Sequence, residues 1–303
     1  MIKVIFMGTP DYASEILKKL IDDKKIEVIS AYTQPDKPVG RKKVLTPPPV
    51  KVLANEHNIK VFQPIKLKEE ESIKSVLEQE CDFIIVAAYG QILPKEILNH
   101  APCINLHASI LPSYRGASPI QQSLLNGDEK TGVTAMLMDE GLDTGDIIKI
   151  QECKIDEDMM VEELFKKLTS IASDLTVDVI KNFSSYTPVP QDDKKATYCK
   201  KITKADGLIE FDDAKKIYNK YRAFTPWPGI YLKSGLKIKK MVKLTEDGEY
   251  PQGKILEIGD DFIVVGTTKG ALKVLRVQPA SKKEMDILSY INGKRLKVED
   301  TLS

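Results

Sequence analysis

The sequence has few of the residues that build disulfide frameworks, metal centres or membrane spans. Its 303 residues include four cysteines, which show neither CxxC nor Cys/His ligand spacing. No apolar run approaches the ~20 residues that a membrane-spanning helix needs, and the apolar start is too short for a signal peptide. We therefore expect a cytoplasmic protein with reduced thiols and no metal. The four thiols belong to Cys81, Cys103, Cys153 and Cys199.

Net charge is also nearly absent, but the total of +1 hides an asymmetry along the chain. Residues 194–303 contain 23 Lys and Arg against 14 Asp and Glu, a net charge of +9, which leaves −8 for residues 1–193. A basic part favours a polyanionic partner, because lysine and arginine neutralise phosphates and release their counterions. A solvated lysine-rich surface is the alternative.

Glycine is scarce where a dinucleotide-binding protein needs it. The turn after the first apolar stretch reads GTPDYA at residues 8–13, with one glycine where the phosphate-binding fingerprint has three. The turn therefore argues against NAD. What remains is a doubly wound sheet, whose ligands usually bind beyond the carboxyl ends of the strands.

The first part of the chain alternates between strand-like and helix-like patterns. Such alternation predicts a Rossmann-like, doubly wound, mainly parallel sheet. The expected strands are residues 3–7, 27–32, 60–62, 83–87, 103–106, 131–138 and 147–152. Helices are expected to follow residue 10 and to cover residues 50–57, 69–78 and 160–183.

The pattern changes after a stretch rich in serine, proline and charge. Residues 184–195 have the composition of a linker, which divides the chain into a domain at 1–183 and a smaller one at 196–303. In the second domain a helix at 213–224 precedes short strands at 236–242, 253–258, 262–266 and 271–277. This spacing predicts an OB-like β-barrel, a common platform for nucleic acid.

Two polar residues at the end of one predicted strand are candidates for catalysis. Asn105 and His107 lie two residues apart, so both face the same side of the strand. An amide and an imidazole there can donate hydrogen bonds to a carbonyl oxygen that becomes anionic when an amine attacks its carbon. Asp143, in a glycine-bracketed loop, can fix the protonation of the imidazole and help to manage the proton of the amine. On spacing alone, His107 could equally be a satisfied hydrogen-bonding residue and Asp143 a turn former.

Four motifs in the same order give a more specific interpretation. They read FMGTP at residues 6–10, AYGQILP at 88–94, NLHASILPSYRG at 105–116 and EGLDTG at 140–145. Together they resemble the motifs of the 10-formyltetrahydrofolate-dependent formyltransferases. The one departure is Ile110, where the family usually has leucine.

The resemblance implies a formyltransferase fold and roles for individual residues. It implies that Asn105, His107 and Asp143 are catalytic and that 10-formyltetrahydrofolate is the co-substrate. The folate is expected to contact the backbone of the 91–93 segment, which holds the pterin, and part of the long motif. These residues are Gln91, Ile92, Leu93, Ser109, Leu111 and Pro112.

The resemblance is strongest to family members that formylate the α-amine of methionyl-initiator tRNA. Residues 33–43, TQPDKPVGRKK, resemble their insertion loop, which enters the acceptor arm of the tRNA, although Lys42 replaces the usual glycine. A proline-bounded basic loop can place guanidinium and ammonium groups against phosphates or bases. We expect tRNA contact from Arg41, Lys42, Lys43, Lys237, Lys239 and Lys240, and a monomeric enzyme. Trp227, between two prolines, is expected to be a packing anchor rather than a base-stacking residue.

Two alternatives remain open at this stage. Sugar-nucleotide N-formyltransferases and the formyltetrahydrofolate hydrolase module resemble the catalytic domain but need neither a basic barrel nor the insertion loop. A non-catalytic RNA-binding protein on the same scaffold is the other alternative, and the intact catalytic residues argue against it.

Overall fold

The computed structural model describes residues 1–40 and 42–302, and the chain divides into two compact units. The first unit comprises residues 1–119, 130–154 and 164–199. The second comprises residues 120–129, 155–163 and 200–303. The helix predicted at 213–224 therefore shares its unit with two short segments from earlier in the sequence.

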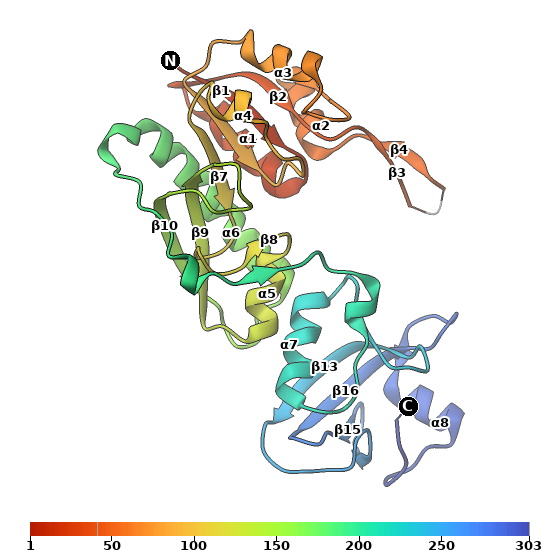
Figure 1. Cartoon of the computed structure of the whole chain (residues 1–303). Helices are drawn as coiled ribbons and strands as arrows, with labels where there is room; N and C mark the ends of the chain where they lie inside the picture. Colours follow the sequence, from red (N-terminus) through yellow and green to blue (C-terminus); the bar gives the residue numbers. More distant parts are fainter. Residues whose placement is uncertain (41, 303) are drawn as a thin grey trace. The chain divides into compact units, whose positions relative to one another are not determined.

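A seven-stranded, mostly parallel sheet forms the centre of the first unit, as the sequence predicts (Figure 1). Its strand order is β10-β9-β7-β6-β1-β2-β5, and the pairs from β7 to β5 are parallel while β9 and β10 are antiparallel. The strands are β1 (Ile2–Gly8), β2 (Ile26–Tyr32), β5 (Lys60–Phe62), β6 (Phe83–Ala87), β7 (Cys103–His107), β9 (Lys130–Leu137) and β10 (Ile147–Lys154). The predicted strands match these within two residues at each end, and the signal is strongest where the strand is a short buried apolar run, as in β1 and β6.

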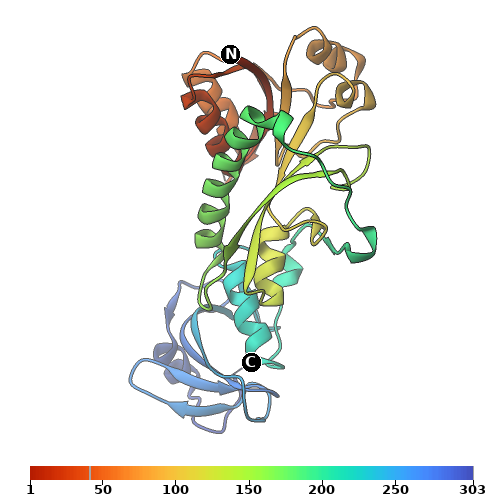
Figure 2. The ribbon, with the colours of Figure 1, turned by 90° about the vertical axis from the view of Figure 1, so that its left-hand side faces the viewer.

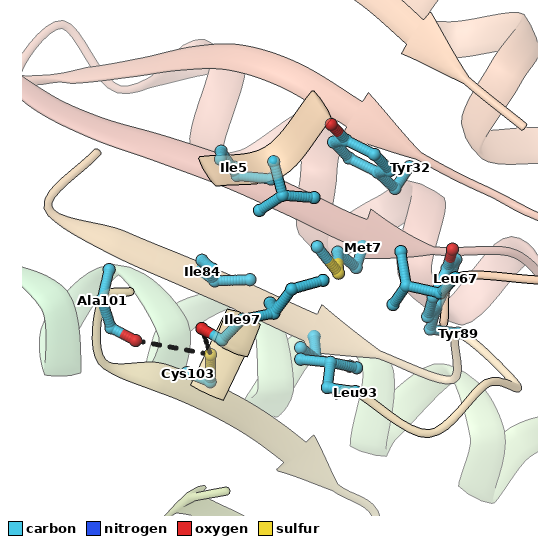
Figure 3. Close-up of a cluster of buried hydrophobic side chains, with 12 residues drawn as sticks. Ile5, Met7, Tyr32, Leu67, Ile84, Tyr89, Leu93, Ile97, Ala101 and Cys103 are labelled. Atoms are coloured by element: carbon cyan, nitrogen blue, oxygen red, sulfur yellow. Dashed lines mark hydrogen bonds between the residues drawn. The ribbon is translucent and has the colours of Figure 1, made fainter. Parts of the chain in front are cut away.

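Helices cover both faces of this sheet. On one face, α3 (Glu70–Leu77) and α4 (Lys95–Leu98) contribute Val76 and Ile97 to a buried cluster with Ile5 and Met7 of β1 (Figure 3). On the other face lie α1 (Asp11–Asp22) and the long α6 (Val161–Lys181), which Figure 2 shows in green beside the strands. A further helix, α2 (Pro49–Glu56), packs against α1. The fold is therefore doubly wound.

A short hairpin projects from the first unit between β2 and α2. It consists of β3 (Lys37–Val39) and β4 (Val44–Thr46), and both strands are exposed throughout (Figure 1). Asp36 fixes its base by accepting hydrogen bonds from Lys51 Nζ at 2.9 Å and Gln63 Nε2 at 2.8 Å. These contacts lower the pKa of the Asp36 carboxyl, the amide of Gln63 contributing most. The sequence pattern did not predict the hairpin. Each of its strands has three residues, all exposed, which is too short to show an alternation of apolar and polar side chains.

The second unit contains a six-stranded antiparallel sheet beside α7 (Ala214–Phe224), α5 (Pro119–Asn126) and α8 (Ile287–Lys294). The sheet order is β12-β13-β16-β15-β14, with β17 paired to β16. Within the described residues β12 and β14 do not pair with each other, so the sheet is open and the closed barrel that we expected is not formed. The strands are β12 (Ile230–Tyr231), β13 (Lys237–Thr245), β14 (Ile255–Ile258), β15 (Ile263–Gly266), β16 (Ala271–Gln278) and β17 (Met285–Asp286).

The stretch predicted as a linker, residues 184–195, belongs to the first unit, as do the residues after it up to Cys199. It includes two short 3₁₀ turns and an antiparallel bridge in which Val189 and Ile147 exchange backbone hydrogen bonds of 2.8 and 2.9 Å. It then forms β11 (Tyr198–Cys199), which pairs with β8 (Arg115–Gly116). None of the helices in residues 1–40 and 42–302 is both long and apolar enough to cross a membrane.

Candidate active site

The structure brings the three candidate catalytic residues together. Asn105 and His107 lie on β7, opposite Met136 and Thr134 of β9. Asp143 comes from the loop between β9 and β10, and its Oδ1 accepts a hydrogen bond of 3.3 Å from Asn105 Nδ2. Its Oδ2 lies 3.7 Å from His107 Nδ1. Residues 38 positions apart in the sequence thus share one site.

Asp143 is held in an uncommon backbone conformation and is largely shielded from solvent. Its φ is 55°, in the left-handed region that few residues other than glycine, asparagine and aspartate adopt. Its side chain is 13% exposed, and Oδ2 also accepts a hydrogen bond of 2.8 Å from Gly116 N. A charged carboxylate that is nearly buried needs such donors.

The hydrogen bonds of His107 fix which ring nitrogen carries a proton. Nε2 lies 2.9 Å from the carbonyl oxygen of Tyr114, and a carbonyl only accepts, so Nε2 donates. The remaining nitrogen, Nδ1, faces Asp143.

The turn that carries Tyr114 and Gly116 is held by the residues after the predicted linker. Tyr114 N donates to Thr197 Oγ1 at 2.9 Å, and Gly116 pairs with Cys199. A Cβ at Gly116 would lie 2.3 Å from the carbonyl oxygen of Cys199, and its φ is 116°, so this position requires glycine. The motif around Gly116 indicated the family, but the backbone donor to Asp143 appears only in the structure.

Cys199 also lies beside the site, but its surroundings make it unreactive. Its Sγ donates to the carbonyl oxygen of Tyr114 at 3.4 Å and accepts from Ser118 N at 3.3 Å. Burial, and to a smaller extent the charge of Asp143, raises the pKa of this thiol. The thiolate that a nucleophile requires is therefore disfavoured.

The loop after β6 exposes the backbone expected to hold the pterin. The side chain of Gln91 accepts from Leu67 N at 2.7 Å and donates to the carbonyl oxygen of Pro64 at 3.0 Å. Within the described residues, the N–H groups of Gln91, Ile92 and Leu93 make no hydrogen bond. The Ile92 side chain is 83% exposed. Free backbone donors next to an exposed apolar side chain fit a flat heteroaromatic ring.

The other expected folate residues are more enclosed. Ser109 is fully buried and its hydroxyl donates to the carbonyl oxygen of Ser113 at 2.6 Å. Leu111 is buried too, and its N–H donates to Thr134 Oγ1 at 3.1 Å. Pro112 is half-buried. These side chains shape the turn that follows His107, and their contact with folate stays a prediction.

The residues expected to contact tRNA lie on two separate elements. Lys42 and Lys43 are exposed at the tip of the β3–β4 hairpin, while Arg41 lies outside the described residues. On β13, Lys240 is exposed and Lys237 and Lys239 are half-buried. A bulge between Ile238 and Lys240 shifts the register in which β13 pairs with β16.

Two observations in the second unit qualify the expected RNA surface. Lys240 borders a hollow of about 480 Å³ that also includes Arg276 and the carboxylates of Asp260, Asp261 and Asp286. Trp227 is 59% exposed. Our expectation that Trp227 is a packing anchor was therefore wrong, because its flanking prolines hold it in a loop rather than in a core.

Comparisons with known proteins place the chain in a family. The family model described as "Formyl transferase" matches residues 2–180, and "Formyl transferase, C-terminal domain" matches residues 201–295. The chain belongs to the formyltransferase family. The methionyl-tRNA formyltransferase of Sulfurimonas denitrificans is 64% identical over 301 residues, which cover 99% of this formyltransferase and 100% of that protein. The methionyl-tRNA formyltransferase of Campylobacter jejuni strain RM1221 is 47% identical over 305 residues, covering 100% of both chains.

Solved structures of lower identity share the fold of this formyltransferase. WlaRD, a sugar 3N-formyl transferase in the presence of dTDP and 5-N-formyl-THF, superposes with a TM-score of 0.69 at 20% identity. The match covers 93% of this formyltransferase and 99% of WlaRD. HypX from Aquifex aeolicus in complex with tetrahydrofolic acid gives a TM-score of 0.61 at 15% identity, covering 99% of this chain and 48% of HypX.

Proposed function

We propose that this formyltransferase moves the formyl group of 10-formyltetrahydrofolate to the α-amine of methionyl-initiator tRNA, giving N-formylmethionyl-tRNA for translation initiation. The observation that carries the reaction is the contact of Asp143 with both Asn105 and His107. Identity of 47–64% over whole chains to proteins named methionyl-tRNA formyltransferase supports the acceptor.

The three catalytic residues have distinct tasks in the proposed mechanism. The neutral α-amine of the methionyl group attacks the formyl carbon, and the formyl oxygen gains negative charge. Asn105 donates one amide hydrogen to that oxygen and keeps the other on Asp143. His107, in the imidazolium form that carries a hydrogen on each ring nitrogen, donates from Nδ1. Asp143 orients the imidazole and assists the loss of the proton from the attacking amine. The bond between the formyl carbon and N10 of the folate then breaks, N10 takes up the proton lost by the amine, and tetrahydrofolate leaves.

The hydrogen bonds and the burial of His107 support the roles proposed for the three residues. The carbonyl oxygen of Tyr114 holds Nε2, which leaves Nδ1 as the nitrogen that can face the reacting group. The side chain of His107 is 7% exposed. Hydrogen bonds to a developing oxyanion are stronger where water is excluded.

The folate and tRNA surfaces are part of the same proposal. The unpaired backbone N–H groups of Gln91, Ile92 and Leu93 hold the polar edge of the pterin. Lys42 and Lys43 of the hairpin tip contact the acceptor arm of the tRNA, and so does Arg41, which precedes them in the sequence. Lysines 237, 239 and 240 contact its backbone, on a sheet that we assign to the OB-like class although it is open.

We also propose that the chain forms two domains, at 1–183 and 196–303, joined by residues 184–195. The protein is a cytoplasmic monomer in this proposal. Limited proteolysis tests the boundaries, since cleavage should begin between 184 and 195. Light scattering at micromolar concentration tests the monomer.

Acceptor specificity is the experiment that decides the function. The protein is incubated with 10-formyltetrahydrofolate and, separately, with methionyl-initiator tRNA, methionyl-elongator tRNA and UDP-aminosugars. We expect formylation of the initiator tRNA and little of the others. Formylation of an aminosugar alone would contradict the proposal, and tRNA binding without any transfer would point to a non-catalytic RNA-binding protein.

A further inference from the structure

One residue of the predicted linker touches the loop that carries Asp143. Gln191 Nε2 donates to the carbonyl oxygens of Asp143 at 2.9 Å and Gly145 at 2.7 Å. Its Oε1 accepts from Arg115 Nη2 at 2.8 Å and from Arg115 Nε at 3.1 Å. Backbone carbonyls only accept and a guanidinium only donates, so the orientation of the Gln191 amide is unambiguous.

The partners of Gln191 lie on both sides of the catalytic carboxylate. Asp143 and Gly145 belong to the loop that presents it. The side chain of Arg115 is 2% exposed and precedes Gly116, whose N–H donates to Asp143 Oδ2. Gln191 therefore connects the loop that presents the carboxylate with the turn that supplies one of its donors.

The loop needs such a support because local preference does not hold it in place. Asp143 has a φ of 55°, which the backbone adopts stably only when its surroundings fix it. Leu142, next to it, is 61% exposed and contributes little packing. The two carbonyls bound by Gln191 belong to Asp143 itself and to Gly145, so Gln191 holds the backbone that directly follows the Cα of Asp143.

We infer that Gln191 is a positioning residue for Asp143. The inference rests on the proposed function. Gln191 does not touch the reacting groups. It holds the Asp143 loop so that Oδ2 stays near His107 Nδ1, and a displacement of about 1 Å at a catalytic group can cost up to about 10²-fold in rate.

Gln191→Glu is the sharpest substitution, because it preserves the size of the side chain and replaces the amide donor with a charged acceptor. The carboxylate still accepts from Arg115 but has no hydrogen for the carbonyls of Asp143 and Gly145, which it repels. We expect kcat for formyl transfer to fall by about tenfold or more, with KM for both substrates within about twofold of the wild type. Gln151→Glu, on the exposed edge of β10, adds the same charge away from the site and should leave kcat unchanged.

A double-mutant cycle separates positioning from a general structural role. In an Asp143→Ala background there is no carboxylate left to position, so Gln191→Glu should lower kcat no further. Gln191→Met, similar in length and uncharged, should behave in the same way. Melting temperatures and folate binding are measured for each variant.

The outcomes distinguish this inference from the proposed function. Wild-type protein without transfer to methionyl-tRNA would remove the proposed function itself. Normal transfer by the wild type and an unchanged kcat in Gln191→Glu would overturn the positioning role alone. An equal loss in both backgrounds, or loss of the folded state in both Gln191 variants, would also overturn it.

Discussion

His107 Nδ1 lies 3.7 Å from Asp143 Oδ2, while the other ring nitrogen of His107 donates to the carbonyl oxygen of Tyr114. The imidazole is therefore fixed at one nitrogen by backbone and faces a carboxylate with the other. This arrangement makes the charge of Asp143, and not only its shape, necessary for the proposed reaction.

Replacing Asp143 by asparagine tests that charge. The substitution keeps the size of the side chain and an acceptor for Gly116 N, but removes the negative charge that faces Nδ1. We expect a loss of ~10²-fold or more in single-turnover rate, with both substrates still bound. His107→Ala should lose a similar factor. Asp174→Asn, on an exposed surface, is the matched control, and near wild-type turnover in a folded Asp143→Asn protein would refute the assignment.

Gly145 tests the packing of the catalytic loop. A Cβ there would lie 1.8 Å from the carbonyl oxygen of Leu137, so Gly145→Ala must displace the loop. We expect at least a tenfold loss of turnover, in keeping with misplaced catalytic groups. At Gly293 in α8 a Cβ meets nothing within 4 Å, and Gly293→Ala should be neutral or stabilising by up to about 1 kcal/mol. Equal activity of the two variants would contradict this account.

The hairpin lysines test the tRNA surface. If Lys42 and Lys43 contact phosphates, replacing both by alanine should reduce the slope of log affinity against log salt by roughly 1.5 to 2. Arg41→Ala should lower transfer to tRNA while folate binding is unchanged. Lys74→Ala is the control, because that side chain is exposed on α3. If the slope of log affinity against log salt were unchanged in the double variant, Lys42 and Lys43 would not contact tRNA phosphates.

Asp206 gives a pH-dependent stability prediction in the second unit. Lys200, which contributes most, and Thr203 lower the pKa of its carboxyl from 3.8 to about 2. The folded-state pKa lies below the unfolded one, so this stabilisation is fully present above pH 3.8 and is lost as the pH falls through about 2. Asp206→Asn should lower the unfolding free energy by about 1 kcal/mol at pH 7, after allowance for solvent screening.

The measurement is urea unfolding followed by Trp227, the only tryptophan, which lies in the same unit. The difference between Asp206→Asn and the wild type should shrink as the pH is lowered towards 2. Asp260→Asn, at an exposed carboxylate, is the comparison. If the difference in unfolding free energy persisted unchanged at low pH, the effect of the substitution would not come from the charge of Asp206.

The predictions that failed concern features with weak local signals. The β3–β4 hairpin was missed because its side chains are exposed, so no apolar pattern marks it. The helices α5 and α8 have eight residues each and were also missed. Closure of the barrel depends on whether β12 and β14 meet, and the spacing of turns along the chain carries no information on that pairing.

The sequence by itself determined the order and limits of the elements that carry the site. Buried strands such as β6 are continuous apolar runs. In β7 the two-residue period of a strand places Asn105 and His107 on one side. These are local properties, so a single sequence shows them. The motifs around both residues also specified the family.

Only the tertiary structure decided how the site is assembled. Asp143 meets Asn105 across 38 positions of sequence, and Gln191 meets Asp143 across 48. The orientation of the His107 ring depends on the carbonyl oxygen of Tyr114, which no side-chain pattern reveals. Such contacts arise when separate segments pack together, and their donors and acceptors are chosen by that packing rather than by the periodicity of any one segment.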